Sequence, residues 1–279
     1  MSVPTTTLPS GDELPQIGFG TWNIPEGDVA DAVRTAIDAG YTHIDTAEGY
    51  QNEAGIGEAL ADYDREDLFV TSKVLPSNLN YESLIESCEA SLDRLGTDYL
   101  DLFLIHWPNP AISLRETFQA MERLHERGLI RNIGVSNFSQ YQLSAAHHIA
   151  DFPIAVNQFE YHPWFQRPGL VEYCEETDTV IEAAAPLSRS DVFDDEVVRE
   201  LSETYDVSPA QVVLRWAMDN DVVVIPKSSS PDHIRDNLES VELELDDSDR
   251  RRLDERDRDR PCYDTGPRDW TRDVYGISE

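Results

Sequence analysis

Four side chains in the first part of the sequence have the chemistry needed to deliver a proton to a carbonyl oxygen. Asp45 ends an apolar run, Tyr50 follows it in an expected loop, and Lys73 and His106 each end a later apolar run. The reference pKa of tyrosine is about 10, so a tyrosine donates a proton efficiently at neutral pH only if a neighbouring cation lowers its pKa. A lysine held by an aspartate provides such a cation. A histidine beside the phenol can orient the carbonyl oxygen.

Each of these residues also has an ordinary structural interpretation. An acid after a strand is often the N-cap of the following helix. A loop tyrosine is usually a half-buried aromatic residue with its hydroxyl in water. His106, between Ile105 and Trp107, is by itself more typical of a packed core histidine. The catalytic interpretation therefore depends on all four residues meeting at one place in the fold.

The elements that would position these residues alternate between apolar strands and amphipathic helices. A β-hairpin is expected over residues 5–20, and the helical spacing of 28–39 ends at Gly40, before the strand that leads to Asp45. Further helices are expected over 53–63, 81–95, 113–127, 194–205 and 209–219, and from residues 139, 168, 231 and 246. Together with the segment I-G-F-G-T, this pattern gives eight βα units.

Eight such units favour an α/β fold of the (β/α)8 TIM barrel type, because barrel strands are covered on both sides and their number closes the ring. An open doubly wound sheet is the alternative, but no G-x-G-x-x-G motif follows the first strand. A barrel places catalytic groups at the carboxyl-terminal ends of its strands. Polar residues lie at or near the ends of the expected strands: Asp45, Lys73, His106, Ser136, Asn137, Gln158 and Lys227.

The composition indicates a single domain over residues 1–279 that is cytoplasmic. No basic patch followed by an apolar block begins the chain, and no apolar run approaches the roughly 18 residues of a membrane span. The 55 acids and 22 bases give a net charge of −33, which would repel nucleic acid. In molar salt the Debye length falls to roughly 3 Å, where such a surface is tolerable. We therefore interpret the charge as that of a halophile.

The basic residues are almost all arginines. Of the 22 bases, 20 are arginines and two are lysines, Lys73 and Lys227. Since lysine is otherwise absent, each of the two is expected to have a chemical role.

A metal site or disulfide framework is not expected. The three cysteines are far apart and form no C-x-x-C motif: Cys88, Cys174 and Cys262. His147 and His148 are adjacent on an expected helix, where neighbouring side chains point about 100° apart rather than toward one ion.

The chain resembles the aldo-keto reductase family along nearly its whole length. The matching motifs are G-F-G-T-W (18–22), D-T-A-E-G-Y (45–50), T-S-K (71–73), L-I-H-W-P (104–108), G-V-S-N-F (134–138), N-Q-F-E-Y-H-P (157–163) and I-P-K-S (225–228). Several rare motifs in the right order make the resemblance specific. It implies the barrel fold, a nicotinamide dinucleotide held in extended form at the rim, and hydride transfer to or from an aldehyde or ketone.

The resemblance also implies a role for particular residues. Tyr50 would be the general acid, Lys73 and Asp45 would tune it, and His106 would orient the substrate. Trp22 and Trp107 would complete the substrate pocket with Tyr50 and His106. The positions that the family pattern assigns to the cofactor are Gly20, Thr21, Trp22, Asp45, Ser136, Asn137, Gln158, Leu187, Lys227, Ser228, Ser229, His233, Asp236 and Asn237.

Within that set, Ser136, Asn137 and Gln158 would hold the nicotinamide carboxamide. The segment Lys227 to Ser229 precedes an expected helix, whose first N–H groups favour a phosphate. The family uses this loop for the 2′-phosphate of NADPH.

Two positions depart from the family pattern. His233 stands where the family usually has an arginine for the adenosine phosphate, so NADH is an alternative to NADPH. Arg235 could substitute, although helix geometry rotates it about 200° from residue 233.

Ala184 stands where an aromatic ring commonly stacks on the nicotinamide, and Ala185 replaces a frequent phosphate-contacting serine. A lost stack of about 0.5–1.5 kcal/mol would loosen cofactor binding without removing catalysis.

We interpret the chain as a monomeric NAD(P)H-dependent enzyme that acts on a small carbonyl substrate, with no nucleic acid or membrane partner. Two other interpretations remain open. One is a cofactor-binding barrel with a redox-sensing or regulatory role, and the other is a barrel enzyme that uses Lys227 to bind a phosphate substrate. A loop after Pro261 is expected to fold over the rim, carrying the aromatic residues Tyr263, Trp270 and Tyr275.

Overall fold

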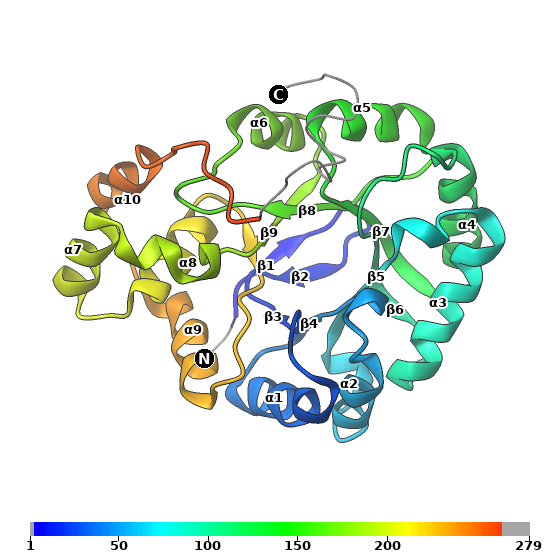
Figure 1. Ribbon diagram of the computed structural model, residues 1–279, viewed down its shortest axis with the longest axis horizontal. Coiled ribbons are helices and arrows are strands. Elements are labelled where there is room, and N and C mark those ends of the chain that lie inside the picture. Colours follow the sequence, from blue (N-terminus) through cyan, green and yellow to red (C-terminus); the bar gives the residue numbers. More distant parts are fainter. Residues whose placement is uncertain (1–2, 264–279) are drawn as a thin grey trace.

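The computed structural model describes residues 3–263, and parallel strands form a barrel at its centre (Figure 1). The strands follow the order β10-β9-β8-β7-β6-β5-β4-β3 around the sheet. Their bounds are Phe19–Gly20 (β3), His43–Asp45 (β4), Phe69–Val74 (β5), Leu100–Ile105 (β6), Ile130–Ser136 (β7), Val156–Glu160 (β8), Val180–Ala184 (β9) and Val223–Val224 (β10). Each strand pairs in parallel with the next one along the chain.

Backbone hydrogen bonds between the β3 and β10 regions close the ring. The amide of Gly18 donates to the carbonyl oxygen of Val224 at 2.8 Å, and the amide of Gly20 donates to that of Pro226 at 3.1 Å. A Cβ at residue 20 would lie 2.7 Å from the carbonyl oxygen of Ile225, so this close approach requires glycine. The predicted (β/α)8 barrel is confirmed, and the open doubly wound sheet is excluded.

Helices surround the barrel on the outside (Figure 1). Their bounds are Glu26–Ala39 (α1), Glu53–Leu60 (α2), Tyr81–Leu95 (α3), Leu114–Glu126 (α4), Gln140–Ile149 (α5), Pro168–Glu176 (α6), Glu196–Tyr205 (α7), Pro209–Asp219 (α8), Pro231–Glu239 (α9) and Asp247–Asp254 (α10). Short 3-10 helices are η1 (Glu48–Tyr50), η2 (Arg65–Asp67), η3 (Pro76–Asn78), η4 (Ser188–Asp194) and η5 (Ser240–Glu242).

Local sequence signals fix the ends of several helices. The helix expected from residue 139 is α5, and Ser139 forms a capping box with Gln142 at its start. Gly40 follows α1 with a φ of 120°, a conformation that favours glycine. The helix expected from residue 194 begins two residues later, because the side chain of Asp195 accepts a hydrogen bond from the amide of Val197 at 3.0 Å and caps α7.

The expected N-terminal hairpin closes the amino-terminal end of the barrel. Its strands, Thr5–Thr7 (β1) and Glu13–Pro15 (β2), pair antiparallel. Leu8 and Leu14 are buried in a small apolar cluster with Phe69, Leu102, Leu104, Ala155, Val156 and Val223. Several of these partners begin barrel strands, so the hairpin seals the end opposite the predicted site.

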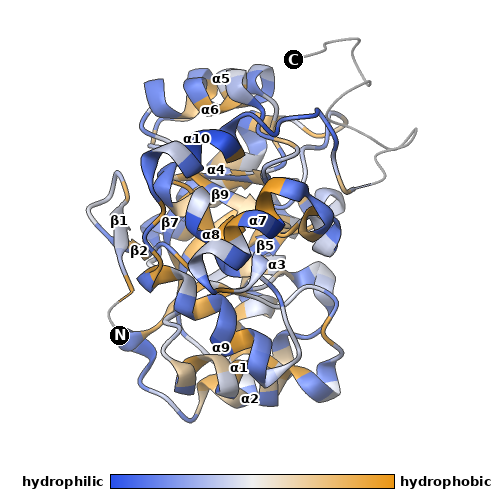
Figure 2. Cartoon of the chain, turned by 90° about the vertical axis from the view of Figure 1, so that its left-hand side faces the viewer, coloured by the Kyte–Doolittle hydropathy of each residue, from blue (hydrophilic) through white to orange (hydrophobic). Residues whose placement is uncertain are grey.

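The main hydrophobic core lies between the strands and the helices that cover them. Apolar colours gather around the strands and on helix faces, whereas outward helix surfaces are largely polar (Figure 2). Burial of these faces stabilises the barrel by about 25 cal/mol for each Å² of apolar surface removed from water. Within residues 3–263, no helix has the length and apolar character needed to cross a membrane.

Candidate active site

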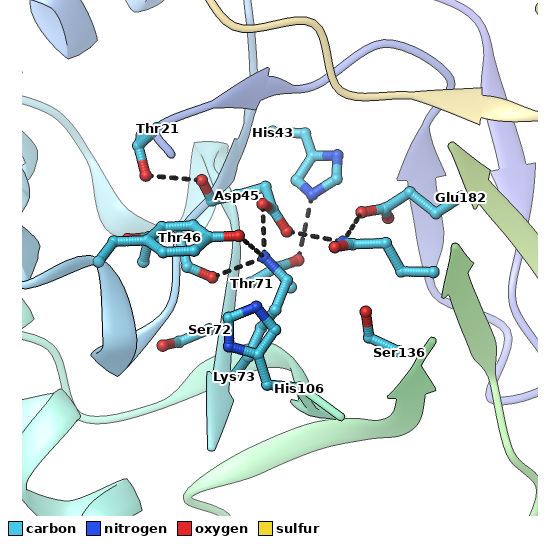
Figure 3. A network of polar contacts seen from close by, with 12 residues as sticks. Thr21, His43, Asp45, Thr46, Thr71, Ser72, Lys73, His106, Ser136 and Glu182 are labelled. Atoms are coloured by element: carbon cyan, nitrogen blue, oxygen red, sulfur yellow. Dashed lines mark hydrogen bonds and ion pairs between the residues drawn. The ribbon is translucent and has the colours of Figure 1, made fainter. Parts of the chain in front are cut away.

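Lys73 is the centre of a buried hydrogen-bond network at the carboxyl-terminal end of the barrel (Figure 3). Its side chain is fully buried. Its ammonium nitrogen donates to Oδ1 of Asp45 at 2.6 Å, to the carbonyl oxygen of Thr46 at 2.9 Å and to the phenolic oxygen of Tyr50 at 3.2 Å. The three N–H groups of the ammonium are therefore all satisfied. The structure brings Asp45, Tyr50 and Lys73 together as the sequence indicated.

The register of two neighbouring strands explains this meeting. Asp45 on β4 lies opposite Thr71 on β5. Lys73 follows Thr71 by two residues, and alternate residues of a strand point to the same face. Both Asp45 and Lys73 therefore point into the barrel. Removing two charges from water costs several kcal/mol per ion, which the short ion pair and the additional hydrogen bonds offset.

The loop that carries Tyr50 is held by two polar residues that sequence reasoning missed. Glu48, on η1, accepts hydrogen bonds from the Ser87 hydroxyl at 2.6 Å and the Asn78 amide at 3.2 Å. Asn52 is fully buried, and its side-chain amide donates to the backbone carbonyl oxygen of Thr21 at 2.9 Å and to that of Ile24 at 3.0 Å. Glu48 and Asn52 each lie two residues from Tyr50 in the sequence. This placement was the signal that could have identified them as supports of the Tyr50 loop.

Burial changes the expected proton affinity of Tyr50. Desolvation raises the pKa of Tyr50, and the positive charge of Lys73 opposes this rise. The resulting pKa of Tyr50 lies above the ordinary tyrosine value. The expectation that Lys73 would bring this pKa below the ordinary value is therefore wrong for this arrangement. Lys73 instead limits a rise caused by burial. Tyr50 is therefore protonated at neutral pH and holds a proton that it can donate.

His106 lies beside Tyr50 as a neutral ring. The two ring centres are 5.5 Å apart, and the planes meet at 77°. Burial, aided by the charge of Lys73, lowers the pKa of His106 to about 3. Nδ1 of His106 is buried and has no hydrogen-bond partner among the described residues. The other nitrogen, Nε2, is therefore the polar atom through which this ring can act on a ligand.

Gln158 links Asp45 to a second buried carboxyl group, Glu182. The side-chain amide nitrogen of Gln158 donates to Oδ2 of Asp45 at 2.9 Å and to Oε1 of Glu182 at 2.5 Å. Burial, followed by the nearby charge of Asp45, raises the pKa of Glu182 to about 8. Sequence reasoning missed Glu182, although an acid inside the strand V-I-E-A-A was a signal. Because both amide hydrogens are used, the oxygen of Gln158 is left to accept from a ligand.

A cavity of about 450 Å³ opens over these residues. This size is typical of a site for a small molecule. The predicted residues in its wall are Gly20, Trp22, Asp45, Tyr50, His106, Trp107, Ser136, Asn137, Gln158, Leu187 and Lys227. The wall also contains Gly49, Leu75, Ala184, Ala185, Pro186, Arg189, Ser190, Ile225, Pro226 and Tyr263.

Ser136 and Asn137 are positioned by the end of β7. Asn137 has a φ of 61°, and its amide nitrogen donates to the carbonyl oxygen of His106 at 2.9 Å and to the Ser136 hydroxyl at 3.0 Å. Its backbone amide donates to the carbonyl oxygen of Gln158 at 2.7 Å. The three residues expected to hold a carboxamide therefore lie on adjacent strand ends and bond to one another.

A second cavity, of about 620 Å³, shares Leu187, Ser190 and Lys227 with the first. Its wall includes the predicted residues Ser228, His233, Asp236 and Asn237. The two cavities therefore adjoin at these shared residues.

Arg235 also lines the second cavity, beside His233. Both side chains are exposed. The expectation that the rotation of about 200° takes Arg235 away from this place is wrong, because the cavity runs along α9 and both residues line it. The guanidinium of Arg235 lies 3.6 Å from the carboxylate of Asp232, which lines the same cavity.

Two of the predicted cofactor residues lie outside the walls of both cavities. Thr21 is fully buried, and its hydroxyl donates to the carbonyl oxygen of Asp45 at 2.9 Å. Ser229 is exposed next to Ser228. In this structure Thr21 therefore supports the strand end that carries Asp45.

The segment after Pro261 reaches the mouth of the first cavity, as expected for Tyr263. The backbone amides of Cys262 and Tyr263 donate to the carboxylate of Glu160, at 2.5 and 3.3 Å. Nε2 of His162 lies 2.8 Å from the same carboxylate. Trp270 and Tyr275, the other aromatic residues predicted to cover the rim, lie outside the described residues.

Glu160, His162 and Cys262 have potential metal-ligating atoms within 4.8 Å of one another, a grouping that the sequence did not suggest. In the structure these groups bond to one another and to the backbone. The arrangement therefore anchors the chain near its described end.

Comparisons with known proteins identify the family of this chain. The Aldo/keto reductase family model matches residues 16–258. The chain is 39% identical over 258 residues to a glyoxal reductase of Bacillus subtilis (strain 168), covering 91% of this chain and 93% of the relative. It is 35% identical over 312 residues to an NADP-dependent D-sorbitol-6-phosphate dehydrogenase of Malus domestica, covering 97% and 99% of the two chains.

A solved structure gives the same result for the fold. The aldose reductase of Schistosoma japonicum superposes with a TM-score of 0.89 at 32% identity, covering 94% of each chain. The chain belongs to the aldo/keto reductase family and is an NAD(P)H-dependent oxidoreductase.

Proposed function

We propose that this protein reduces small aldehydes or ketones to alcohols, with Tyr50 as the proton donor. The observation that carries this proposal is the position of Lys73, whose ammonium contacts both Asp45 and the phenolic oxygen of Tyr50 beneath a cavity. His106 lines the same cavity as a neutral ring. These groups supply one proton and orient one oxygen, which is what carbonyl reduction requires of the protein.

In the proposed reaction the carbonyl carbon gains a hydride and the carbonyl oxygen gains the proton of Tyr50. The hydride comes from the dihydronicotinamide ring when the cofactor is bound. Tyr50 passes its proton to the oxygen as negative charge develops there. The phenolate that remains lies 3.2 Å from the Lys73 ammonium, which stabilises it, and takes up a proton from solvent before the next turnover.

Asp45 and His106 have separate duties in this scheme. Asp45 holds the Lys73 ammonium at 2.6 Å, so the cation stays directed at the phenol. His106 directs the substrate oxygen toward Tyr50 through Nε2, because its ring is neutral and its Nδ1 is buried. Such positioning lowers the barrier by removing the entropy cost of bringing the groups together.

The residues around both cavities fit a nicotinamide dinucleotide. The free side-chain oxygen of Gln158 can accept from a carboxamide N–H, and Ser136 and Asn137 lie beside it. Lys227 lines both cavities and offers a cation to phosphate groups. Leu187 also lines both cavities, so it would contact the middle of an extended cofactor.

We further propose NADPH as the preferred cofactor, with NADH as a weaker alternative. The second cavity holds Arg235 beside His233, with Lys227 and Ser228 near the start of α9. The wall also contains Asp232, Asp236 and Glu239, and Asp232 is 3.6 Å from Arg235, so the two cations would bind a ribose phosphate against nearby acids. A histidine at position 233 makes this preference smaller than an arginine there would.

The cellular setting is also part of the proposal. The net charge of −33 supports a cytoplasmic enzyme that works as a monomer at high salt, in the manner of a halophile. A single-domain barrel over residues 1–279 agrees with the match of the family model to 16–258. The acidic surface disfavours nucleic acid as a partner.

A direct assay tests this function. Purified protein in molar KCl is mixed with NADPH or NADH and a panel of small aldehydes and ketones, and cofactor oxidation is followed by absorbance. We expect turnover, with kcat lower by about 100-fold or more in Tyr50→Phe, because general acid catalysis contributes about 10² to 10⁴-fold. Turnover of Tyr50→Phe at the wild-type rate would contradict the proton-donor assignment. Cofactor binding without turnover of any carbonyl compound would favour a regulatory barrel.

A further inference from the structure

Arg189 presents a cation at the mouth of the first cavity. It lies on η4, in the connection between β9 and α7, with a φ of 51°. Its guanidinium carbon is 5.3 Å from the ring centre of Trp22 and 5.2 Å from that of Tyr263. All three residues line the cavity that also contains Tyr50. Two aromatic rings therefore hold a positive charge over the space beside the proposed proton donor.

Arg189 has no carboxylate partner within residues 3–263. Most arginines in this part of the chain form an ion pair, as expected for a protein with 55 acids and 22 bases. Arg189 contacts aromatic rings instead. Its planar guanidinium can bind a carboxylate or a phosphate through two parallel hydrogen bonds, and this capacity is unused in the described structure.

The charges of the cavity wall favour an anion. Asp45 is the carboxylate residue in the described wall, and its charge is matched by Lys73 at 2.6 Å. Arg189 and Lys227 add two positive charges. The remainder of the protein carries a large excess of acids and would repel an anionic ligand. This cavity is therefore locally cationic in a strongly acidic molecule.

The position of Arg189 relative to the two cavities separates it from the proposed phosphate groups of the cofactor. Leu187, Ser190 and Lys227 line both cavities, whereas Arg189 lines the first one alone. Its neighbours in that wall are Tyr263 and Trp22, and the sequence predicts Trp22 for both the substrate and the cofactor. The positive charge of Arg189 is therefore available in the first cavity, where the substrate is expected to bind.

We propose that Arg189 binds an anionic group of the substrate, so that the preferred substrates are small aldehydes or ketones that carry a carboxylate or phosphate. This inference rests on the proposed carbonyl reduction. The carbonyl oxygen would lie at Tyr50 and His106, and the charged end would extend to Arg189 at the mouth. The Trp22 and Tyr263 rings hold the guanidinium in place, which reduces the entropy lost when it binds the anion.

Matched substrate pairs provide the test. The carboxylate arm compares succinic semialdehyde with its neutral methyl ester, and the phosphate arm compares glyceraldehyde 3-phosphate with glyceraldehyde. For each pair the ratio of kcat/KM, charged over neutral, is measured at one fixed KCl concentration, together with the KM for NADPH. We expect wild-type ratios above one in at least one arm, and a ratio about 10- to 100-fold lower in Arg189→Gln, as for loss of a hydrogen bond to a charged group.

Two variants serve as controls. Arg189→Lys keeps the charge but loses the paired hydrogen bonds, so its ratio should fall between those of wild type and Arg189→Gln. Arg115→Gln changes the net charge equally at an exposed position on α4 away from the cavity wall, so its ratio should equal that of wild type.

Each outcome has a distinct meaning. Wild-type ratios at or below one in both arms overturn the proposal whether or not a variant folds. An unchanged ratio in folded Arg189→Gln, with a higher KM for NADPH, overturns it in favour of a contact with the cofactor. Failure to reduce any carbonyl compound, charged or neutral, would instead contradict the proposed function. Failure of the Arg189 proposal is therefore distinguishable from failure of the proposed function.

Discussion

The ammonium nitrogen of Lys73 lies 3.2 Å from the phenolic oxygen of Tyr50 and donates a hydrogen bond to it. Burial raises the pKa of this tyrosine, and the lysine charge is the largest opposing influence. Lys73 therefore controls how readily Tyr50 releases its proton. The composition agrees with this importance, since Lys73 is one of two lysines in the chain.

Replacing Lys73 by methionine should affect both stability and activity. The variant leaves the Asp45 carboxylate buried without its partner, which costs about 3–5 kcal/mol of unfolding free energy. It also removes the cation that stabilises the Tyr50 phenolate, so kcat should fall by about 100-fold or more. Urea unfolding and steady-state kinetics, both at fixed KCl, measure these effects.

The double variant Asp45→Asn/Lys73→Met separates the two losses. Removal of both charges should recover most of the lost stability, because a buried pair can be replaced by neutral groups at little cost. Activity should stay low in the double variant. Recovery of activity together with stability would mean that Lys73 acts only by balancing Asp45.

Glu182 should make stability depend on pH between its unfolded and folded pKa values. Burial raises its pKa from an ordinary value of 4.5 to about 8, so the folded chain binds one more proton than the unfolded chain across this window. Its contribution to stability is complete below pH 4.5 and is lost as pH rises toward 8. Glu182→Gln should remove this loss, which is on the order of 5 kcal/mol at about 1.4 kcal/mol per pH unit.

The measurement is the difference in unfolding free energy between wild type and Glu182→Gln at several pH values. A difference removes the effect of the other acids, which both proteins share. The variant should gain stability relative to wild type as pH rises from 5 to 8. Curves that stay parallel across this range would mean that Glu182 is already ionised in the folded protein.

A change of His233 to arginine should strengthen the preference for NADPH. A guanidinium beside Arg235 in the second cavity would add a charge-assisted hydrogen bond to a ribose phosphate. The KM for NADPH should fall about tenfold, which corresponds to about 1.4 kcal/mol, while that for NADH stays the same. Initial rates with each cofactor give this comparison.

Arg235→Gln is the matched control in the same cavity. It should raise the KM for NADPH if Arg235 supplies the phosphate contact that the sequence appeared to lack. An equal change in the KM values for NADPH and NADH would place both side chains away from the ribose phosphate.

Salt should stabilise the folded protein strongly. The net charge of −33 produces repulsion that extends about 10 Å at 0.1 M salt and about 3 Å at 1 M. The midpoint of thermal unfolding should rise between 0.1 and 2 M KCl. Replacing two exposed acids of α3, in Glu86→Gln/Asp93→Asn, should reduce this dependence. A protein that is most stable without added salt would contradict the halophile interpretation.

The sequence predicted the barrel and the four residues beneath the cavity because each depends on local pattern. An apolar run that ends in Asp45 or Lys73 is a strand end, and strand ends of a barrel converge. Glu182 was missed because the role of an acid within an apolar strand comes here from its contact with Gln158 on the neighbouring strand, which the local pattern does not give.

Three further points depend on three-dimensional contacts. The direction of the Tyr50 pKa depends on how completely the phenol is buried, which sequence spacing does not give. Arg235 was expected to point away from His233, but both side chains reach one cavity because that cavity runs along α9. Arg189 drew no attention in the sequence because its aromatic neighbours, Trp22 and Tyr263, are distant along the chain.

The hydrogen bonds that join the β3 and β10 regions have a consequence for behaviour in concentrated salt. A strand at a sheet edge exposes unpaired backbone groups that can recruit another chain, and proteins often use charge to prevent this. Molar salt screens such charge to within about 3 Å. Within residues 3–263 the eight-stranded sheet leaves no edge open, so its resistance to intermolecular strand pairing is built into its connectivity and persists when electrostatic repulsion is screened.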